Sequence, residues 1–254
     1  MSELLFAVDD GVGRVTFNRP DQRNALTWAM YDGLVEAVRR VDADEGVRAL
    51  VLTGAGGRAF AAGTDISQFR SFSRPEDALE YERRIDAVLS VLEACRVPTI
   101  AALPGACIGG GAAIAACCDL RIADPALRYG FPIARTLGNC LSMVNLARLS
   151  ALIGAGRVKE LIFTARLIGA EEAVAIGLVS EIVDGDLLAR ADAIARQIAG
   201  HAPLTLRSTK MALRKLRGEV AEDEALILMA YQSADFREGM EAFLTKRAPH
   251  WKGV

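Results

Sequence analysis

The chain has 254 residues, of which 52% are hydrophobic and 24% are charged, so a disordered or strongly solvated polypeptide is excluded. Its 30 basic and 32 acidic residues leave a formal net charge of −2, which argues against nucleic acid as the main partner. The two histidines, His201 and His250, lie in no metal-binding spacing, so we expect no metal site.

In chain order, an Asp10-Gly11 turn before the alternating segment 13–18 predicts a hairpin. Thr27 is the expected N-cap of a helix that runs to about residue 41. The apolar segment 47–53 predicts a buried strand, Pro75 opens a long amphipathic helix to about residue 95, and 119–123 predicts another short strand.

The run 97–118 carries no charge and is long enough to cross a bilayer. Its prolines and glycines would break one continuous helix. We therefore expect a buried strand at 99–103 and a buried helix at 110–117, and no membrane segment.

Five cysteines, an odd number, stand in apolar surroundings: Cys95, Cys107, Cys117, Cys118 and Cys140. This pattern is typical of buried thiols in a reducing compartment. The first ten residues lack the basic start of a signal peptide. We therefore expect a cytoplasmic protein.

Beyond residue 140 the pattern is mostly helical, with helices expected at 141–150, 155–164, 170–176, 187–199, 203–217 and 220–245. Alternating strands and helices followed by helices alone predict an α/β core with a helical C-terminal region. We place the core at 1–195 and the helical C-terminal region at 196–254.

Two glycine-containing segments, 60–66 and 105–111, each lead into an expected helix. A helix N-terminus exposes unpaired backbone N–H groups and the positive end of the helix dipole, and glycine lets a ligand approach that backbone closely. Two such N-termini that converge would form an oxyanion hole. The glycines at 54–57 follow a strand but lack the G-x-G-x-x-G spacing, so a dinucleotide fingerprint is excluded.

Six segments, in the same order, resemble the crotonase superfamily, also called the enoyl-CoA hydratase/isomerase family, over essentially the whole chain. They are 18–26 (NRPDQRNAL), 59–66 (AFAAGTDI), 104–111 (PGACIGGG), 118–123 (CDLRIA), 170–179 (AEEAVAIGLV) and 243–249 (FLTKRAP). The resemblance implies a ββα spiral core and a helical C-terminal trimerisation region, often within a hexamer built as a dimer of trimers. It also implies a coenzyme A thioester as substrate, without a separate cofactor.

The resemblance assigns the two oxyanion-hole N–H groups to Thr64 and Gly110. It further implies four residues that bind the nucleotide of coenzyme A: Arg23 near the phosphates, Ala62 at the adenine through its backbone, and Phe243 and Lys246 from a neighbouring subunit. Arg23 as a solvated turn residue and Phe243 as a core residue are the plainer alternatives.

A hydratase of this family uses two glutamates, and both positions are apolar in this chain. The first falls on Ala113 and the second on Ile133, and a shift of one residue gives only Ala134. A positioned acid or base contributes about 10²–10⁴-fold to a rate. Efficient hydration by the usual mechanism is therefore not expected.

Other side chains are candidates to replace the glutamates. Asp86 lies one turn beyond Glu82 on the long helix, with a plain surface charge as the alternative. Arg135 is suited to a substrate carboxylate, Asn139 to hydrogen bonding, and Cys140 has no histidine nearby in sequence to activate it.

Three functions remain open from the sequence. The first is an acyl-CoA-processing enzyme, nominally an enoyl-CoA hydratase or isomerase, that stabilises a thioester enolate at Thr64 and Gly110. The second is an isomerase or decarboxylase that uses Asp86, Arg135 or Asn139. The third is a member that binds acyl-CoA without turnover.

Overall fold

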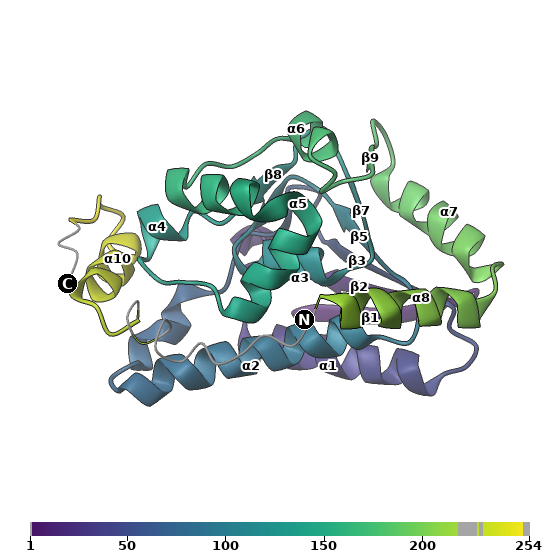
Figure 1. The fold of residues 1–254 in the computed structure, drawn as a ribbon, viewed down its shortest axis with the longest axis horizontal. Helices are drawn as coiled ribbons and strands as arrows, with labels where there is room; N and C mark the ends of the chain where they lie inside the picture. Colours follow the sequence, from purple (N-terminus) through teal and green to yellow (C-terminus); the bar gives the residue numbers. More distant parts are fainter. Residues whose placement is uncertain (1, 218–227, 229–230, 251–254) are drawn as a thin grey trace.

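The computed structural model describes residues 2–217, 228 and 231–250 (Figure 1). The end of the expected helix at 220–245 is described, as α10 (Ala234–Leu244), whereas most of residues 218–230 lie outside the described part. No helix among the described residues is long and apolar enough to cross a membrane.

The larger sheet has six strands in the order β1-β2-β3-β5-β7-β9. β1 and β2 are antiparallel and every other neighbouring pair is parallel. The predicted hairpin is confirmed, since Asp10 and Gly11 both have positive φ, as a tight hairpin turn requires. The strands are β1 (Leu4–Asp9), β2 (Val12–Phe17), β3 (Ala49–Gly54), β5 (Thr99–Leu103), β7 (Leu120–Ala123) and β9 (Glu181–Ile182).

A second, parallel sheet of three short strands was not predicted. It has the order β4-β6-β8, formed by Ala59–Ala61, Ala106–Ile108 and Arg128–Gly130. β4 and β6 are the starts of the two glycine-containing segments. Because the carboxyl ends of neighbouring parallel strands lie at the same sheet edge, this sheet brings the two following turns together.

Most predicted helices are confirmed to within a few residues. The described helices are α1 (Trp28–Ala43), α2 (Pro75–Ala94), α3 (Gly110–Cys117), α4 (Ile133–Thr136), α5 (Met143–Thr164), α6 (Ala170–Ala175), α7 (Leu187–Ala199), α8 (Pro203–Leu216) and α10, with 3-10 turns η1 (Pro20–Gln22) and η2 (Ile66–Ser71). Thr27 caps α1 as expected, accepting from the Met30 N–H. Two helices expected at 141–150 and 155–164 form α5, interrupted by Gly154 in a non-helical conformation.

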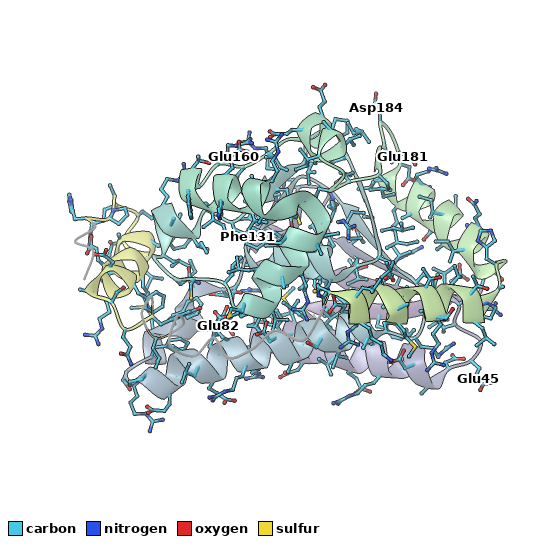
Figure 2. All side chains as sticks on the ribbon, viewed as in Figure 1. Glu45, Glu82, Phe131, Glu160, Glu181 and Asp184 are labelled. Atoms are coloured by element: carbon cyan, nitrogen blue, oxygen red, sulfur yellow. The ribbon has the colours of Figure 1, made fainter. Side chains whose placement is uncertain are left out.

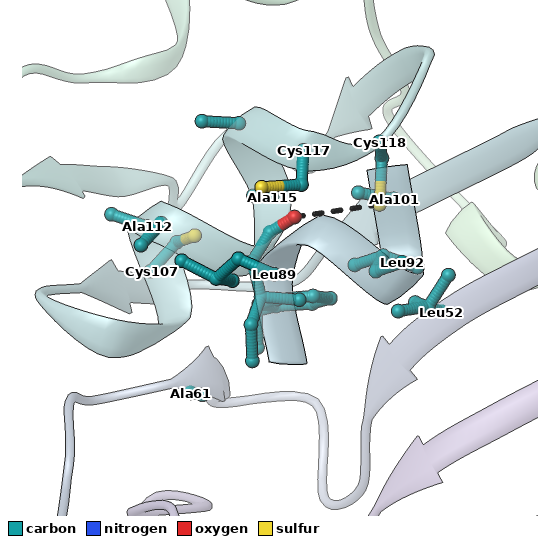
Figure 3. Close-up of a cluster of buried hydrophobic side chains, with 14 of the residues drawn as sticks. Leu52, Ala61, Leu89, Leu92, Ala101, Cys107, Ala112, Ala115, Cys117 and Cys118 are labelled. Carbon is teal, nitrogen blue, oxygen red and sulfur yellow. Dashed lines mark hydrogen bonds between the residues drawn. The ribbon is translucent and has the colours of Figure 1, made fainter. Parts of the chain in front are cut away.

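The main core lies where α2, α3 and α5 pack together over the sheets, and α7 covers the other face at β3 and β5 (Figure 1). Figure 3 shows Cys107, Cys117 and Cys118 among apolar side chains of this main core. Burial raises the pKa of Cys95 to about 11 and that of Cys117 to about 12. These thiols are therefore protonated at neutral pH and behave as core hydrophobes.

A buried ionic cluster joins α2 to α5 and α8. The Arg148 Nε donates to a Glu93 carboxylate oxygen at 3.2 Å, and the Arg217 guanidinium donates to both Glu93 oxygens. Burial acts to raise the pKa of Glu93, but the hydrogen bonds from Arg217 and the charge of Arg148 outweigh it and hold the pKa below its ordinary value.

This cluster predicts acid sensitivity. A carboxyl whose pKa is lower in the folded state adds stability that is complete above its unfolded pKa and is lost as the pH falls through the folded value. We expect Tm, measured by circular dichroism, to fall between about pH 5 and pH 3. The fall should be smaller in Glu93→Gln, and equal slopes in the two proteins would contradict this prediction.

Candidate active site

A cavity of about 420 Å³ opens at the carboxyl edge of the small sheet. Its walls come from the turns after β4 and β6 and from α2, α4 and α10. Both predicted oxyanion-hole residues, Thr64 and Gly110, line it. The structure thus brings together two residues that are distant in the sequence.

The backbone around Thr64 is fixed by one short bridge. The Leu26 N–H donates to the Gly63 carbonyl at 2.8 Å, and the Asp65 N–H donates to the Leu26 carbonyl at 2.9 Å. Neither bond uses the N–H or the carbonyl of Thr64 itself. Gly63, with φ of +115°, adopts a conformation that favours glycine.

The second N–H belongs to the start of α3, where Gly110 is the first helical residue. The first N–H groups of a helix have no partner within the helix. No acceptor within the described part of the chain takes the N–H of either Thr64 or Gly110. Both are donors available to a ligand in the cavity.

Two tyrosine hydroxyls pack behind these donors. The Tyr31 hydroxyl lies 2.8 Å from the Thr64 Oγ1, and the Tyr81 hydroxyl donates to the same atom at 3.3 Å. A Cβ at Gly110 would lie 2.5 Å from the Tyr31 hydroxyl and 2.8 Å from the Thr64 Oγ1. Burial raises the pKa of both phenols well above its ordinary value, so they remain neutral.

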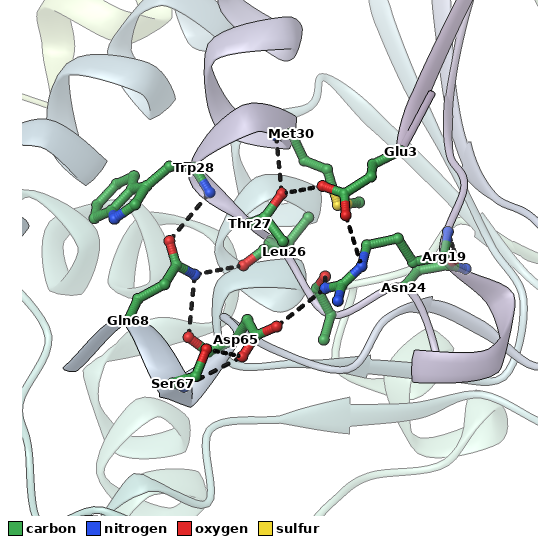
Figure 4. A network of polar contacts seen from close by, with 11 residues as sticks. Glu3, Arg19, Asn24, Leu26, Thr27, Trp28, Met30, Asp65, Ser67 and Gln68 are labelled. Atoms are coloured by element: carbon green, nitrogen blue, oxygen red, sulfur yellow. Dashed lines mark hydrogen bonds and ion pairs between the residues drawn. The ribbon is translucent and has the colours of Figure 1, made fainter. Parts of the chain in front are cut away.

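Polar contacts hold the turn after β4 against the N-terminal part of the chain (Figure 4). Asp65 caps η2 by accepting from the Ser67 N–H at 3.2 Å, and Arg19 donates to its other oxygen at 3.2 Å. Burial acts to raise the pKa of Asp65, but the hydrogen bonds from Ser67 and Arg19 outweigh it and lower the pKa. Asp65 is therefore the N-cap of η2 and is tied to Arg19.

Three of the four expected nucleotide-binding residues, Arg23, Ala62 and Phe243, line the cavity. The Ala62 N–H donates to the Arg23 carbonyl at 3.0 Å, which ties these two together. Phe243 is half exposed and lies at the cavity of its own chain, whereas the resemblance assigned it to a neighbouring subunit. Lys246, just after α10, is not among the lining residues.

The positions of the two family glutamates are apolar cavity walls. Ala113 on α3 and Ile133 at the start of α4 both line the cavity, and both are buried. Ala134 is exposed and is not a lining residue. The structure therefore offers no carboxylate at either position.

The replacement candidates separate into two groups. Asn139 and Cys140 line the cavity, while Asp86 and Arg135 do not. Arg135 is exposed on α4. The Asp86 carboxylate turns toward α5, where it accepts from the Ser142 Oγ at 2.8 Å and from the Asn145 Nδ2 at 3.1 Å.

Glu82, which was not among the catalytic residues predicted from the sequence, does line the cavity. Glu82 on α2 is 4% exposed, and its Oε1 accepts a hydrogen bond from the Tyr231 hydroxyl at 2.5 Å (Figure 2 labels it). The available signal was helical spacing, since Glu82 falls between Leu79 and Ile85 on the buried face of α2.

The enoyl-CoA hydratase/isomerase family model matches residues 7–254. A crotonyl-CoA hydratase of Syntrophomonas wolfei is 36% identical over 252 residues, covering 96% of this chain and 95% of that protein. A short-chain-enoyl-CoA hydratase of Clostridium acetobutylicum is 33% identical over 253 residues, covering 97% and 96%.

Solved structures share the fold of this protein over nearly its whole length. An enoyl-CoA hydratase/carnitine racemase of Magnetospirillum magneticum gives a TM-score of 0.81 at 33% identity, covering 100% of this chain and 97% of that one. A methylmalonyl-CoA decarboxylase in complex with 2-nitronate-propionyl-CoA gives 0.91 at 28% identity, covering 99% of each. Together with the ordered motifs and the two-sheet fold, these matches show that the chain belongs to the enoyl-CoA hydratase/isomerase family.

Proposed function

We propose that this protein is an acyl-CoA-processing enzyme that stabilises a thioester enolate. The observation that carries the proposal is the pair of N–H groups on Thr64 and Gly110, which line one cavity and have no acceptor within the described residues. A thioester oxygen placed between them would gain negative charge as the enolate forms. Each such donor is worth about 3–4 kcal/mol of transition-state stabilisation.

The coenzyme A portion of the substrate is assigned to the mouth of the same cavity. Arg23 would bind a phosphate, and the Ala62 backbone would contact the adenine. Phe243 and Lys246 would complete the nucleotide site. Lys246 needs either a shift of the chain end or a neighbouring subunit, because it is outside the cavity lining of its own chain.

We assign the reaction to isomerisation of an unsaturated thioester rather than to hydration. Hydration needs one group that activates water and one that protonates the α-carbon, and the two usual positions are Ala113 and Ile133. Isomerisation of an unsaturated thioester needs only one group that takes a proton and returns it to another carbon.

A decarboxylase is the second candidate. The TM-score of 0.91 with methylmalonyl-CoA decarboxylase exceeds the 0.81 found with the hydratase/racemase, although the sequence identity is lower. Loss of CO₂ from a 2-carboxyacyl thioester gives the same enolate without a base for the bond-breaking step. Asn139, one of the residues suggested for that role, lines the cavity.

We also propose a homotrimer or a dimer of trimers, located in the cytoplasm. α8 has no buried residue and exposes apolar side chains that an oligomer would cover: Leu204, Met211, Leu213 and Leu216. Several exposed apolar side chains on one helix are typical of an interface, and α8 belongs to the region expected to mediate trimerisation.

Two assays on the wild-type protein test the proposed function. A calorimetric titration with acetyl-CoA should show binding. Crotonyl-CoA hydration, followed as loss of enone absorbance, should be at least about 10²-fold slower than in the Syntrophomonas wolfei hydratase measured in parallel, because each missing carboxylate removes about 10²–10⁴-fold. Failure to bind would contradict the acyl-CoA assignment, and hydration at the rate of that relative would contradict the missing-carboxylate argument.

A further inference from the structure

We propose that Glu82 is the proton-transfer group of this site, in place of the two family glutamates. This inference rests on the proposed enolate chemistry and adds the residue that moves the proton. Glu82 comes from α2, whereas the usual positions, Ala113 and Ile133, belong to α3 and α4.

Among the described residues, two carboxylates line the cavity, and only Glu82 is buried. The other, Asp65, is partly exposed. It caps η2 and forms an ion pair with Arg19. A buried carboxylate is costly unless hydrogen bonds stabilise it. When such a group also faces a cavity, it is a candidate for function.

Glu82 accepts a hydrogen bond from a residue that is distant in the sequence, and that residue is itself hydrogen-bonded. The Tyr231 hydroxyl donates to its Oε1 at 2.5 Å, and the Asn139 Nδ2 donates to the Tyr231 oxygen at 3.2 Å. The hydrogen bond from Tyr231 favours the ionised carboxylate, which is the form that accepts a proton, and Asn139 contacts Tyr231 rather than Glu82. Tyr231 is buried, so this pair excludes water from one side of Glu82.

Glu82 also lies within electrostatic reach of the oxyanion hole. Tyr81 precedes it on α2 and donates to the Thr64 Oγ1. After burial, the negative charge of Glu82 is one of the causes that raise the pKa of Tyr31 and Tyr81, the two hydroxyls packed behind Thr64 and Gly110. Enolisation needs a base that removes the C2 proton and donors that stabilise the oxyanion, and one cavity would supply both.

The proton transfer balances without any other reactant. A Glu82 oxygen takes a proton from C2 of a 3-enoyl thioester, and the electron pair of that C–H bond moves into the conjugated dienolate, whose oxygen binds the N–H groups of Thr64 and Gly110. The Glu82 carboxylic acid then returns the proton to C4, and the double bond lies between C2 and C3.

The test compares Glu82→Gln with Glu80→Gln, because Glu80 is an exposed residue on the same helix and receives the same chemical change. The probe is 3-hexenoyl-CoA, with conversion to the conjugated 2-enoyl thioester followed by absorbance. Hexanoyl-CoA in D₂O, with deuterium at C2 read by mass spectrometry, reports enolisation directly.

We expect Glu82→Gln to lower both rates by about 10²–10⁴-fold, with hexanoyl-CoA binding by calorimetry changed less than threefold. Glu80→Gln should leave both rates within twofold. Rates within threefold of wild type in Glu82→Gln would overturn the inference while leaving the proposed function intact. A wild-type protein that binds hexanoyl-CoA but neither isomerises nor exchanges would overturn it too, whereas absent binding would overturn the proposed function itself.

Tyr231→Phe separates catalysis from a merely structural contact. The negative charge of Glu82 is one of the causes that raise the pKa of the phenols Tyr31, Tyr81 and Tyr231. Burial keeps all three neutral, so removal of the Tyr231 hydroxyl takes away one donor that favours ionised Glu82. The acidic limb of the pH–rate profile should move to higher pH, and an unmoved limb would contradict the inference.

Discussion

Gly110→Pro is expected to lower kcat for a thioester substrate such as 3-hexenoyl-CoA by about 10²–10³-fold, because it deletes one of the two oxyanion donors. Gly110 is the first residue of α3, a position at which proline fits the helix since its N–H is unpaired there. Substrate binding should change much less than kcat, because the donor acts mainly on the charge that develops in the transition state.

The matched control is Gly110→Ala. Its Cβ would press on the Tyr31 hydroxyl and the Thr64 Oγ1 as the proline ring would, at 2.5 and 2.8 Å, but its N–H remains. A much slower proline variant would assign the effect to the lost donor. Equal losses in the two variants would assign it to crowding, and an unchanged rate in Gly110→Pro would rule out the oxyanion hole. Size-exclusion chromatography verifies that assembly is intact.

Arg148→Met is expected to lower the free energy of unfolding by about 3–5 kcal/mol, because it breaks a buried ionic cluster. The Arg148 side chain is 2% exposed and donates to Glu93, to Asn145 and to the Ser90 Oγ. Its removal leaves polar groups of α2 and α5 buried without that partner. Urea denaturation at matched protein concentration measures the loss.

Arg157→Met is the control for this prediction. Arg157 is on the same helix, but it forms an exposed pair with Glu160 three residues away, at 3.0 Å. Exposed pairs of this kind contribute about 0–1 kcal/mol. Equal losses in Arg148→Met and Arg157→Met would show that the buried cluster around Glu93 is no more stabilising than a surface pair.

Relatives that are named as hydratases match this chain, whereas we propose an isomerase reaction for it. Two hydratases match it at 33% and 36% identity over nearly its whole length. The resemblance places the two hydratase glutamates at Ala113 and Ile133, and both are buried apolar residues that line the cavity.

Elements with strong local signals were predictable from the sequence. The alternating segment after Asp10-Gly11, the cap at Thr27 and the proline at 75 each specify local backbone geometry, and β2, α1 and α2 follow. The three strands of the small sheet were missed. Each is three residues long and exists only by pairing with segments that are distant in the sequence, so periodicity carries no signal for them.

The sequence by itself determined the family, and it predicted the two backbone donors at Thr64 and Gly110 and the apolar residues at the two glutamate positions, because these depend on residue type at motif positions. Only the tertiary structure showed that Glu82 lines the cavity and that Asp86, one turn away on the same helix, does not. Helical spacing predicts which face of α2 is buried, but not what packs against each turn of it. Asp86 accepts hydrogen bonds from Ser142 and Asn145 at the start of α5. Glu82 lines the cavity and accepts a hydrogen bond from Tyr231.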